Sequence, residues 1–221
     1  MSKIKAVVFD VGGVLLKGSM VAFGVKAARL LGLSPSLRAL PKLRGLPKKI
    51  ERGEVEAEEA IRELAGNVPE KTVKALIRLF VNEYKPDPQM ARLVAELKPN
   101  YKVAVLSNTN ALQANAYREK GYFRPFELCV LSHEIRAVKP DKNAFDVLLN
   151  RLRIKAGECV FVDNNWNTCR HAREYGLKVV HFRSNRQCFK ALRRLGVEFS
   201  WPVPVRKRPR TKGKPKLRRR R

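Results

Sequence analysis

Short apolar runs alternate along this chain with longer segments of helical period. Five runs rich in β-branched and apolar residues predict buried strands, at residues 5–9, 101–106, 127–131, 158–162 and 178–182. Helical period follows the later runs, at residues 111–120, 142–152, 166–175 and 185–195. Strands that alternate with helices are typical of βαβ units. We therefore expect an α/β fold with a doubly wound, Rossmann-like parallel sheet that is covered on both faces.

Residues 18–98 interrupt this alternation, because they have helical period and no strand pattern. The periodic stretches lie at residues 21–31, 48–64, 70–84 and 88–97. A helical segment of this length directly after the first strand indicates a cap inserted into the core. We therefore expect a core made of residues 1–17 and 99–197, an inserted helical cap at 18–98, and a separate tail at 198–221.

The composition is that of a globular protein. The chain has 221 residues, enough for one buried core plus an insertion, and its hydrophobic fraction is 44%. No apolar stretch approaches the ~20 residues that span a membrane, and residues 1–9 resemble a core strand rather than a signal peptide. The four cysteines lack metal-site spacing, which favours reduced thiols. We expect a cytoplasmic protein without a transmembrane segment.

The net charge of +27 is unusual, and it is unevenly distributed. Residues 206–221 hold eleven Lys and Arg and no acid, while the remaining 36 basic and 20 acidic residues leave the rest of the chain at +16. The tail has too few apolar residues to bury a core, so we expect disorder in isolation. It can bind nucleic acid through phosphate contacts. A solubility tail, a localisation signal and contact with anionic membranes are the other interpretations.

Polar side chains of complementary chemistry follow the predicted strands. Asp10 comes directly after the first strand, Ser107 after the second and Asp163 after the fourth, while Lys139 lies in the segment after the third. In parallel α/β sheets, ligands bind beyond the carboxyl ends of the strands. A carboxylate, a hydroxyl, an ammonium and a second carboxylate at one sheet edge are the groups that handle a phosphoryl group.

Each of these residues has both a chemical and a structural interpretation. Asp10 can attack phosphorus and form an aspartyl-phosphate, or it can cap the turn that follows. Ser107 and Asn108 can bind phosphate at a helix N-terminus, or they can act as N-caps. Lys139 can neutralise phosphate, or it can be a solvated loop residue. Asp163 and Asp10 together offer the hard oxygen ligands that Mg²⁺ prefers.

These motifs resemble those of the haloacid dehalogenase-like hydrolase superfamily, in particular the subfamily with a small helical cap. The resemblance covers most of residues 4–196 and rests on four stretches: Phe9-Asp10-Val11-Gly12-Gly13-Val14, Leu106-Ser107-Asn108-Thr109-Asn110, Val138-Lys139-Pro140-Asp141 and Phe161-Val162-Asp163-Asn164-Asn165. The cap segment Glu51-Arg52-Gly53-Glu54 is similar as well.

The resemblance implies a role for each motif residue. Asp10 would be the nucleophile, Lys139 would orient the phosphate, and the phosphate would be bound by Ser107 and Asn108. A Mg²⁺ ion would be held by Asp10, Asp163, the carbonyl of Gly12 and Asn164.

Two positions depart from the family pattern and suggest slow turnover. Gly12 stands where phosphatases of the family usually carry a second Asp, which acts as general acid and base and is typically worth ~10²–10⁴-fold in rate. Asn164 stands where a second acid usually follows Asp163, and its amide brings no charge to the metal.

Three functions follow as alternatives. The first is a Mg²⁺-dependent phosphomonoester hydrolase that acts on a small phosphorylated metabolite through an aspartyl-phosphate. The second is a catalytically weakened relative that binds nucleic acid or ribosomes, non-specifically, through Arg206–Arg221. The third is a haloacid dehalogenase, whose chemistry needs neither metal nor an acid after the nucleophile.

Overall fold

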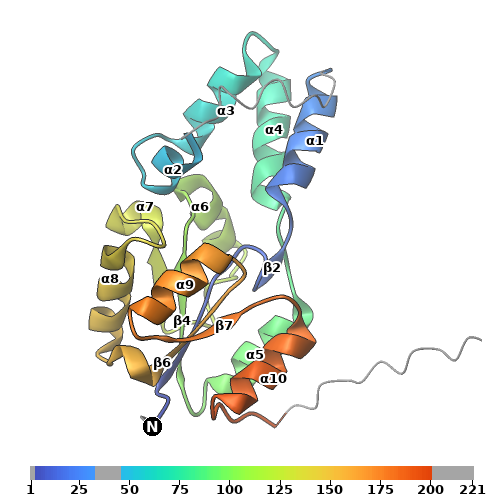
Figure 1. Ribbon diagram of the computed structural model, residues 1–221. Helices are drawn as coiled ribbons and strands as arrows, with labels where there is room; N and C mark the ends of the chain where they lie inside the picture. Colours follow the sequence, from blue (N-terminus) through green and yellow to red (C-terminus); the bar gives the residue numbers. More distant parts are fainter. Residues whose placement is uncertain (1–2, 33–45, 201–221) are drawn as a thin grey trace, which may run out of the picture.

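The computed structural model describes residues 3–32 and 46–200, and its core is a parallel sheet (Figure 1). The five strands lie in the order β5-β4-β1-β6-β7. They are β1 (Ala6–Phe9), β4 (Lys102–Ser107), β5 (Leu128–Leu131), β6 (Cys159–Asp163) and β7 (Lys178–His181). Each coincides with a predicted run, and the predicted doubly wound fold is confirmed. The predicted tail beyond residue 200 lies outside the described residues.

Helices cover both faces of the sheet. One face carries α5 (Pro88–Leu97), α6 (Ala111–Glu119) and α10 (Asn185–Arg194), and the other carries α8 (Lys142–Leu152) and α9 (Trp166–Glu174). The central strand β1 sends Val7 and Phe9 into the first layer and Ala6 and Val8 into the second. All four residues are fully buried, which explains why this strand is a continuous apolar run rather than an alternating one.

Two short elements complete the core. They are the helix α7 (Ser132–Ile135), which follows β5, and the 3₁₀ turn η2 (Ala156–Glu158), which precedes β6.

Within the described residues, the cap has four helices that stand beyond the carboxyl ends of the strands (Figure 1). They are α1 (Met20–Leu30), α2 (Leu46–Glu51), α3 (Ala57–Ala65) and α4 (Glu70–Asn82). The sequence predicted one helix over 48–64, whereas the structure has two. The break lies at Gly53, whose φ of 68° is unfavourable for other residues.

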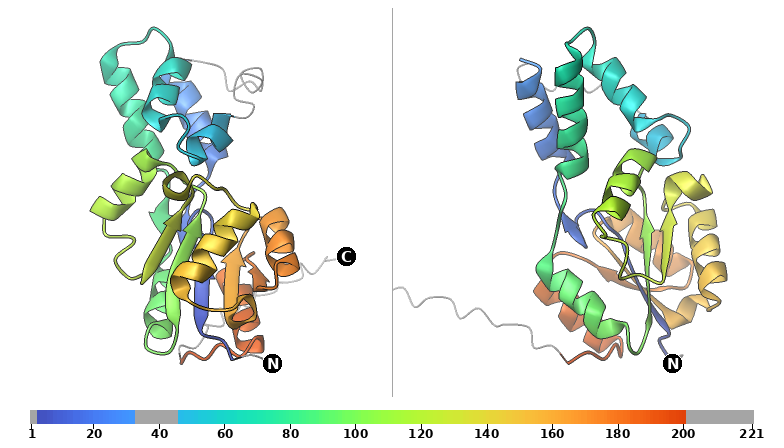
Figure 2. Two further views of the ribbon diagram at one scale, coloured as in Figure 1. Left: turned by 90° about the vertical axis from the view of Figure 1, so that its left-hand side faces the viewer. Right: turned by 180° about the vertical axis from the view of Figure 1, so that it is seen from behind.

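A two-stranded antiparallel ribbon joins the cap to the core. It pairs β2 (Leu16–Lys17) with β3 (Lys85–Pro86). In the right-hand view of Figure 2 the ribbon runs along one side of the molecule, while α2, in cyan, approaches the core on the other side. The cap therefore has a covalent hinge on one side and non-covalent contacts with the core on the other.

Helix α5 belongs to the core layer, although the sequence analysis included it in the inserted segment. Its residues Met90, Leu93 and Leu97 are fully buried in the same cluster as Val7 and Phe9. Helical period identifies an amphipathic helix but does not say which surface the apolar face will contact. The segment between the two strands of the ribbon is therefore shorter than 18–98.

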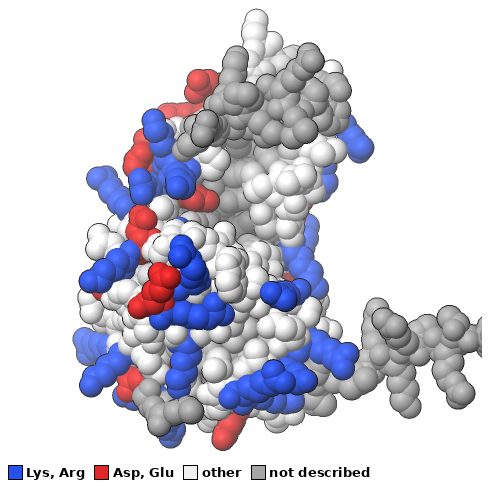
Figure 3. Space-filling model, in the orientation of Figure 1, with Lys and Arg blue, Asp and Glu red and all other residues white. Residues whose placement is uncertain are grey.

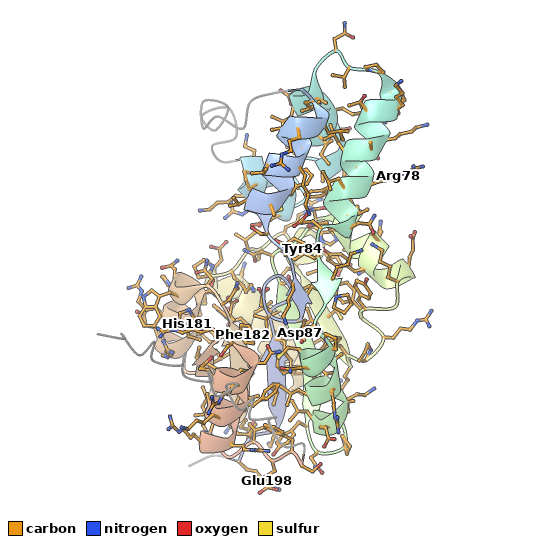
Figure 4. The ribbon with its side chains drawn as sticks, turned by 90° about the vertical axis from the view of Figure 1, so that its right-hand side faces the viewer. Arg78, Tyr84, Asp87, His181, Phe182 and Glu198 are labelled. Atoms are coloured by element: carbon orange, nitrogen blue, oxygen red, sulfur yellow. The ribbon has the colours of Figure 1, made fainter. Side chains whose placement is uncertain are left out.

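Asp87 fastens the ribbon to two core helices, and Figure 4 labels it close to the hinge. It caps α5 by accepting a hydrogen bond from the Gln89 backbone N–H, at 2.9 Å. Its Oδ2 also accepts from Lys17 Nζ at 2.7 Å and from Asn185 Nδ2 at 2.8 Å. The carboxylate is fully buried, and these three donors satisfy it.

Several compositional features can be placed in the structure. Among the described residues, no helix is both long and apolar enough to cross a membrane. The four cysteines are free thiols, of which Cys129 is half-buried and the others are buried. Lys and Arg are scattered over the visible face of the core rather than gathered into one patch (Figure 3).

Candidate active site

The side chains predicted to act together meet at the carboxyl edge of the sheet. Asp10 follows β1, and Asp163 ends the neighbouring strand β6. Lys139 reaches both of them from the loop after α7: its Nζ lies 2.7 Å from Asp10 Oδ1 and 2.7 Å from Asp163 Oδ2. The Lys139 and Asp163 side chains are only 4% and 1% exposed, so one ammonium bridges two carboxylates in a nearly dry setting.

Burial and charge oppose one another in this group. Burial raises the pKa of Asp10 to about 6, although the Lys139 ammonium acts against the rise and Asp163 adds to it. For Lys139, burial would lower the pKa, but the two carboxylates outweigh it and the pKa is raised. Lys139 therefore stays charged and is the fixed positive charge of the site.

The segment after β4 positions Lys139. The Asn108 side chain bonds both backbone groups of Lys139: its Nδ2 donates to the carbonyl at 3.1 Å, and its Oδ1 accepts from the N–H at 2.7 Å. Ser107, which ends β4, is buried at the same edge. The structure thus brings Ser107 and Asn108 to the site. It also shows that Asn108 positions Lys139, a contact that the sequence did not reveal.

A tyrosine from the hinge faces Gly12, where the family usually has an acid. A Cβ built on Gly12 would lie 3.6 Å from Tyr84 Cε1 and 4.0 Å from its Oη. Burial, and then the charges of Asp10 and Glu83, raise the pKa of the Tyr84 phenol. Figure 4 shows Tyr84 where cap and core meet. Position 12 therefore has room for a side chain, and a protonated phenol borders that space.

Asn164 lies against the glycine turn. Its Nδ2 would be 2.3 Å from a Cβ on Gly13, so the Asn164 side chain would have to move for any other residue there. The φ of Gly13, +80°, favours glycine independently. The Asn164 residue is exposed, and its carbonyl lies 3.0 Å from His181 Nε2. Its predicted role as a metal ligand stays a prediction.

The donor set suits Mg²⁺. Within the described residues, no group of three or more His, Cys, Asp or Glu could hold a metal. Asp10 and Asp163 nevertheless both contact the Lys139 ammonium and so lie close to one another. Gly12, whose carbonyl is a further candidate ligand, lies two residues after Asp10. Mg²⁺ usually binds through one or two carboxylates and keeps waters or substrate oxygens as its other ligands. The residues present fit that pattern.

The structure brings Glu51 close to this site from the cap, although no sequence pattern predicts a role for this residue. Lys139 and Asp10 act on the pKa of its carboxyl through their charges, and the Asn108 side chain acts on it as well. Burial raises the pKa of Glu51. The segment 51–54 was recognised only as similar to family members. Its sequence does not show which of several neighbouring cap acids folds onto the core.

Comparisons with known proteins agree with this geometry. A family model described as haloacid dehalogenase-like hydrolase matches residues 4–176. A curated relative, the sesquiterpene phosphatase AstK of Aspergillus oryzae, is 24% identical over 195 residues, which are 86% of this chain and 96% of that protein.

Two solved structures share the fold. An enzyme of the haloacid dehalogenase family from Bacteroides thetaiotaomicron, solved with magnesium and inorganic phosphate, is 22% identical with a TM-score of 0.71; the match covers 81% of this chain and 94% of that one. A protein from Porphyromonas gingivalis described as a predicted HAD-like family hydrolase is 19% identical with a TM-score of 0.72; the match covers 89% of this chain and 100% of that one.

Proposed function

The chain belongs to the haloacid dehalogenase-like hydrolases, and from that membership we propose that it is a Mg²⁺-dependent phosphomonoester hydrolase. The observation that carries the proposal is the buried group of Asp10, Lys139 and Asp163, in which a carboxylate at a strand end contacts a fixed ammonium. An attacking carboxylate beside a fixed positive charge is the arrangement that phosphoryl transfer needs. The named activity of AstK and the magnesium and phosphate bound to the Bacteroides enzyme also support the proposal.

Each residue has a stated task in the reaction. An Asp10 carboxylate oxygen attacks phosphorus and forms an aspartyl-phosphate, which water then hydrolyses. Lys139 balances the charge that collects on the phosphoryl oxygens, and Ser107 and Asn108 bind those oxygens from the end of β4. Asp10, Asp163, the Gly12 carbonyl and Asn164 would hold Mg²⁺, which supplies further charge neutralisation.

We propose a small phosphate ester as the substrate, and an ester with an apolar chain is the second candidate class. A cavity of about 210 Å³ lies beside the hinge. Its lining includes Val11, the neighbour of Asp10, but none of the residues assigned to the site. Its lining is largely apolar and includes Leu15, Leu16, Tyr122 and Phe126. The name of AstK, a sesquiterpene phosphatase, points to the same class.

The experiment compares the purified protein with Asp10→Asn on p-nitrophenyl phosphate, a sugar phosphate and a prenyl phosphate, with Mg²⁺ and with chelator. We expect turnover that needs both Mg²⁺ and Asp10, together with a borohydride-trapped adduct on Asp10. Glu174→Gln, an exposed change on α9, serves as the control and should keep full activity. Equal rates for the parent protein and Asp10→Asn would remove the proposal. Chloride release from a 2-haloacid without metal would favour the dehalogenase alternative.

A further inference from the structure

The proposed reaction needs two proton transfers, and Gly12 cannot perform either. When the ester bond breaks, the leaving oxygen needs a proton. When water attacks the aspartyl-phosphate, it must lose one. A side chain that serves as acid and then as base is typically worth ~10²–10⁴-fold in rate. Another titratable group near Asp10 would have to perform both transfers.

Glu51 lies near enough to Asp10 for the two charges to interact, and the core holds its backbone in place. Its backbone carbonyl accepts a hydrogen bond from the Ser132 hydroxyl. Ser132 Oγ in turn accepts a hydrogen bond from the Thr109 N–H, at 3.0 Å. Its carboxyl lies near enough to the Asn108 side chain for that side chain to lower its pKa. Both the backbone and the carboxyl of Glu51 thus lie near core segments that form the predicted phosphate-binding edge.

The residues after Glu51 strengthen this attachment. Arg52 makes an ion pair with Asp141 at 3.1 Å, in the segment that follows Lys139. A Cβ on Gly53 would lie 3.0 Å from the His133 carbonyl, so the cap backbone approaches α7 closely. These contacts connect α2 to α7 on the side away from the hinge (Figure 2). They form part of the non-covalent contact between cap and core, and Glu51 takes part in it through its backbone carbonyl.

We propose, on the basis of the phosphatase function above, that Glu51 is the general acid and base of this enzyme and replaces the side chain that Gly12 lacks. The direction of attack supports this role. Asp10 attacks from the sheet edge, so an in-line displacement points the leaving oxygen away from the sheet and toward the cap, from which Glu51 comes.

The two steps balance as follows. In the first, the Asp10–phosphorus bond forms, the ester bond breaks, and the Glu51 carboxyl gives its proton to the leaving oxygen to yield an alcohol. In the second, the Glu51 carboxylate takes a proton from water as that oxygen bonds to phosphorus. The bond to Asp10 then breaks, releasing phosphate. Asp10 and Glu51 both return to their starting states.

The surroundings of Glu51 suit both steps. Burial raises its pKa, although the charges of Lys139 and Lys48 and the Asn108 side chain oppose the rise and Asp10 adds to it. A raised pKa keeps more of the acid form available near neutral pH. Tyr84 is the rival donor. Because its pKa is raised from 10.0, it can hydrogen-bond a leaving oxygen but is a poor source of base for the second step.

The test compares Glu51→Gln with Glu54→Gln, an exposed change three residues further along the cap. On an alkyl phosphate, whose leaving group needs a proton, we expect Glu51→Gln to lower kcat by ~10²-fold or more and Glu54→Gln to leave it unchanged. On p-nitrophenyl phosphate, whose leaving group needs none, Glu51→Gln should release a burst of about one nitrophenolate per site. Slow turnover should follow, because the second step lacks its base.

A second variant protects the test against simple misfolding. The contacts around Gly12 leave room for a side chain, so Gly12→Asp on the Glu51→Gln background should restore part of the alkyl phosphatase activity. Tyr84→Phe alone should retain most of the activity. Unchanged kcat in Glu51→Gln, or an equal loss on both substrates without a burst or rescue, would overturn the role of Glu51 while leaving Asp10-dependent hydrolysis intact. Absence of Asp10-dependent turnover in the parent protein would instead overturn the phosphatase proposal and this one with it.

Discussion

At the scale of single residues, one lysine sets the electrostatics of the site. Lys139 is the partner of two buried carboxylates, and its own backbone is fixed by Asn108 on both sides. Breaking a buried ion pair from one side leaves a charge without compensation, which typically costs ~3–5 kcal/mol. Here, removal of the ammonium would leave two neighbouring acids facing each other.

We therefore predict that Lys139→Met abolishes activity and lowers the free energy of unfolding by roughly 3 kcal/mol or more. Adding Asp10→Asn should recover part of that stability, because it removes one of the two buried carboxylates that have lost their counter-charge. Chemical denaturation of the single and double variants measures both effects. Lys142→Met, an exposed change nearby, should have little effect. Strict additivity of Lys139→Met and Asp10→Asn would mean that the two side chains do not interact.

The sequence located the residues that follow strands but not those that come from the cap. Asp10, Ser107 and Asp163 could be placed because an apolar run fixes where a strand ends, and parallel strands end at one edge. Lys139, in the loop after α7, was predicted from its family motif. Glu51 and Tyr84 reach the site through a tertiary approach of two elements, and no periodicity encodes that. A glutamate near a helix end therefore gave no signal of its own.

At the scale of elements, the hinge depends on close approach of its two chains. A Cβ on Gly18 would lie 2.7 Å from Tyr84 Cδ1 and 2.8 Å from the Glu83 carbonyl, so the chain entering the cap lies directly against the chain leaving it. Because one of these neighbours is backbone, the clash cannot be relieved by a side-chain rotation alone. The position of the cap relative to the core therefore depends on Gly18.

We predict that Gly18→Ala displaces the hinge, lowers kcat and destabilises the protein by about 1–3 kcal/mol, the usual cost of overpacking. Gly24→Ala is the matched control, because nothing lies within 4 Å of a Cβ there and the residue is inside α1. It should raise stability by roughly 0.5–1 kcal/mol through helix propensity. Thermal melting with steady-state kinetics measures both. A fully active and stable Gly18→Ala protein would contradict the tight hinge.

The anchor of the hinge should respond to acid. Burial acts to raise the pKa of Asp87, but hydrogen bonds from Lys17, Asn185 and the Gln89 N–H outweigh it, and the pKa is lowered. The stability it contributes is therefore complete above the ordinary value of 3.8 and is lost as the pH falls through the lowered folded-state pKa.

We predict that the difference in free energy of unfolding between the parent protein and Asp87→Asn shrinks as the pH is lowered below about 4. Urea titrations at a series of pH values measure it. Glu174→Gln, which changes an exposed acid on α9, should show no comparable trend. A constant difference across the acid range would mean that the Asp87 charge does not stabilise the fold.

At the scale of the whole molecule, charge and fold are separable. The last helix of the described core, α10, ends at Arg194. The eleven basic residues of 206–221 follow it later in the chain. Lys and Arg elsewhere are scattered over the visible face of the core (Figure 3). Nucleic-acid binding by the tail stays a prediction, and it can be tested apart from catalysis.

We predict that a chain ending at Pro204 melts at nearly the same temperature as the full chain and keeps its phosphatase activity. If the tail binds nucleic acid, the full chain should bind random RNA and duplex DNA at low salt, with a log association constant that falls by roughly 0.7–0.9 per contacted phosphate for each log unit of salt. Equal binding by both chains would move the contact to the core. No binding by the full chain would remove nucleic acid as a partner.

If the chain is the proposed phosphatase, we expect the hinge on one side and the polar contacts of 51–53 on the other to limit the size of its substrates. A ligand attached to a bulky body, such as a phosphorylated protein, would have to hold Glu51 and Arg52 away from α7 to reach Asp10. The phosphate of such a ligand could bind, but the segment 51–53 could not make its contacts with the core while the ligand is bound. We expect such compounds to be competitive inhibitors that are not hydrolysed. The size of the group attached to the phosphate should decide whether a compound is a substrate or an inhibitor.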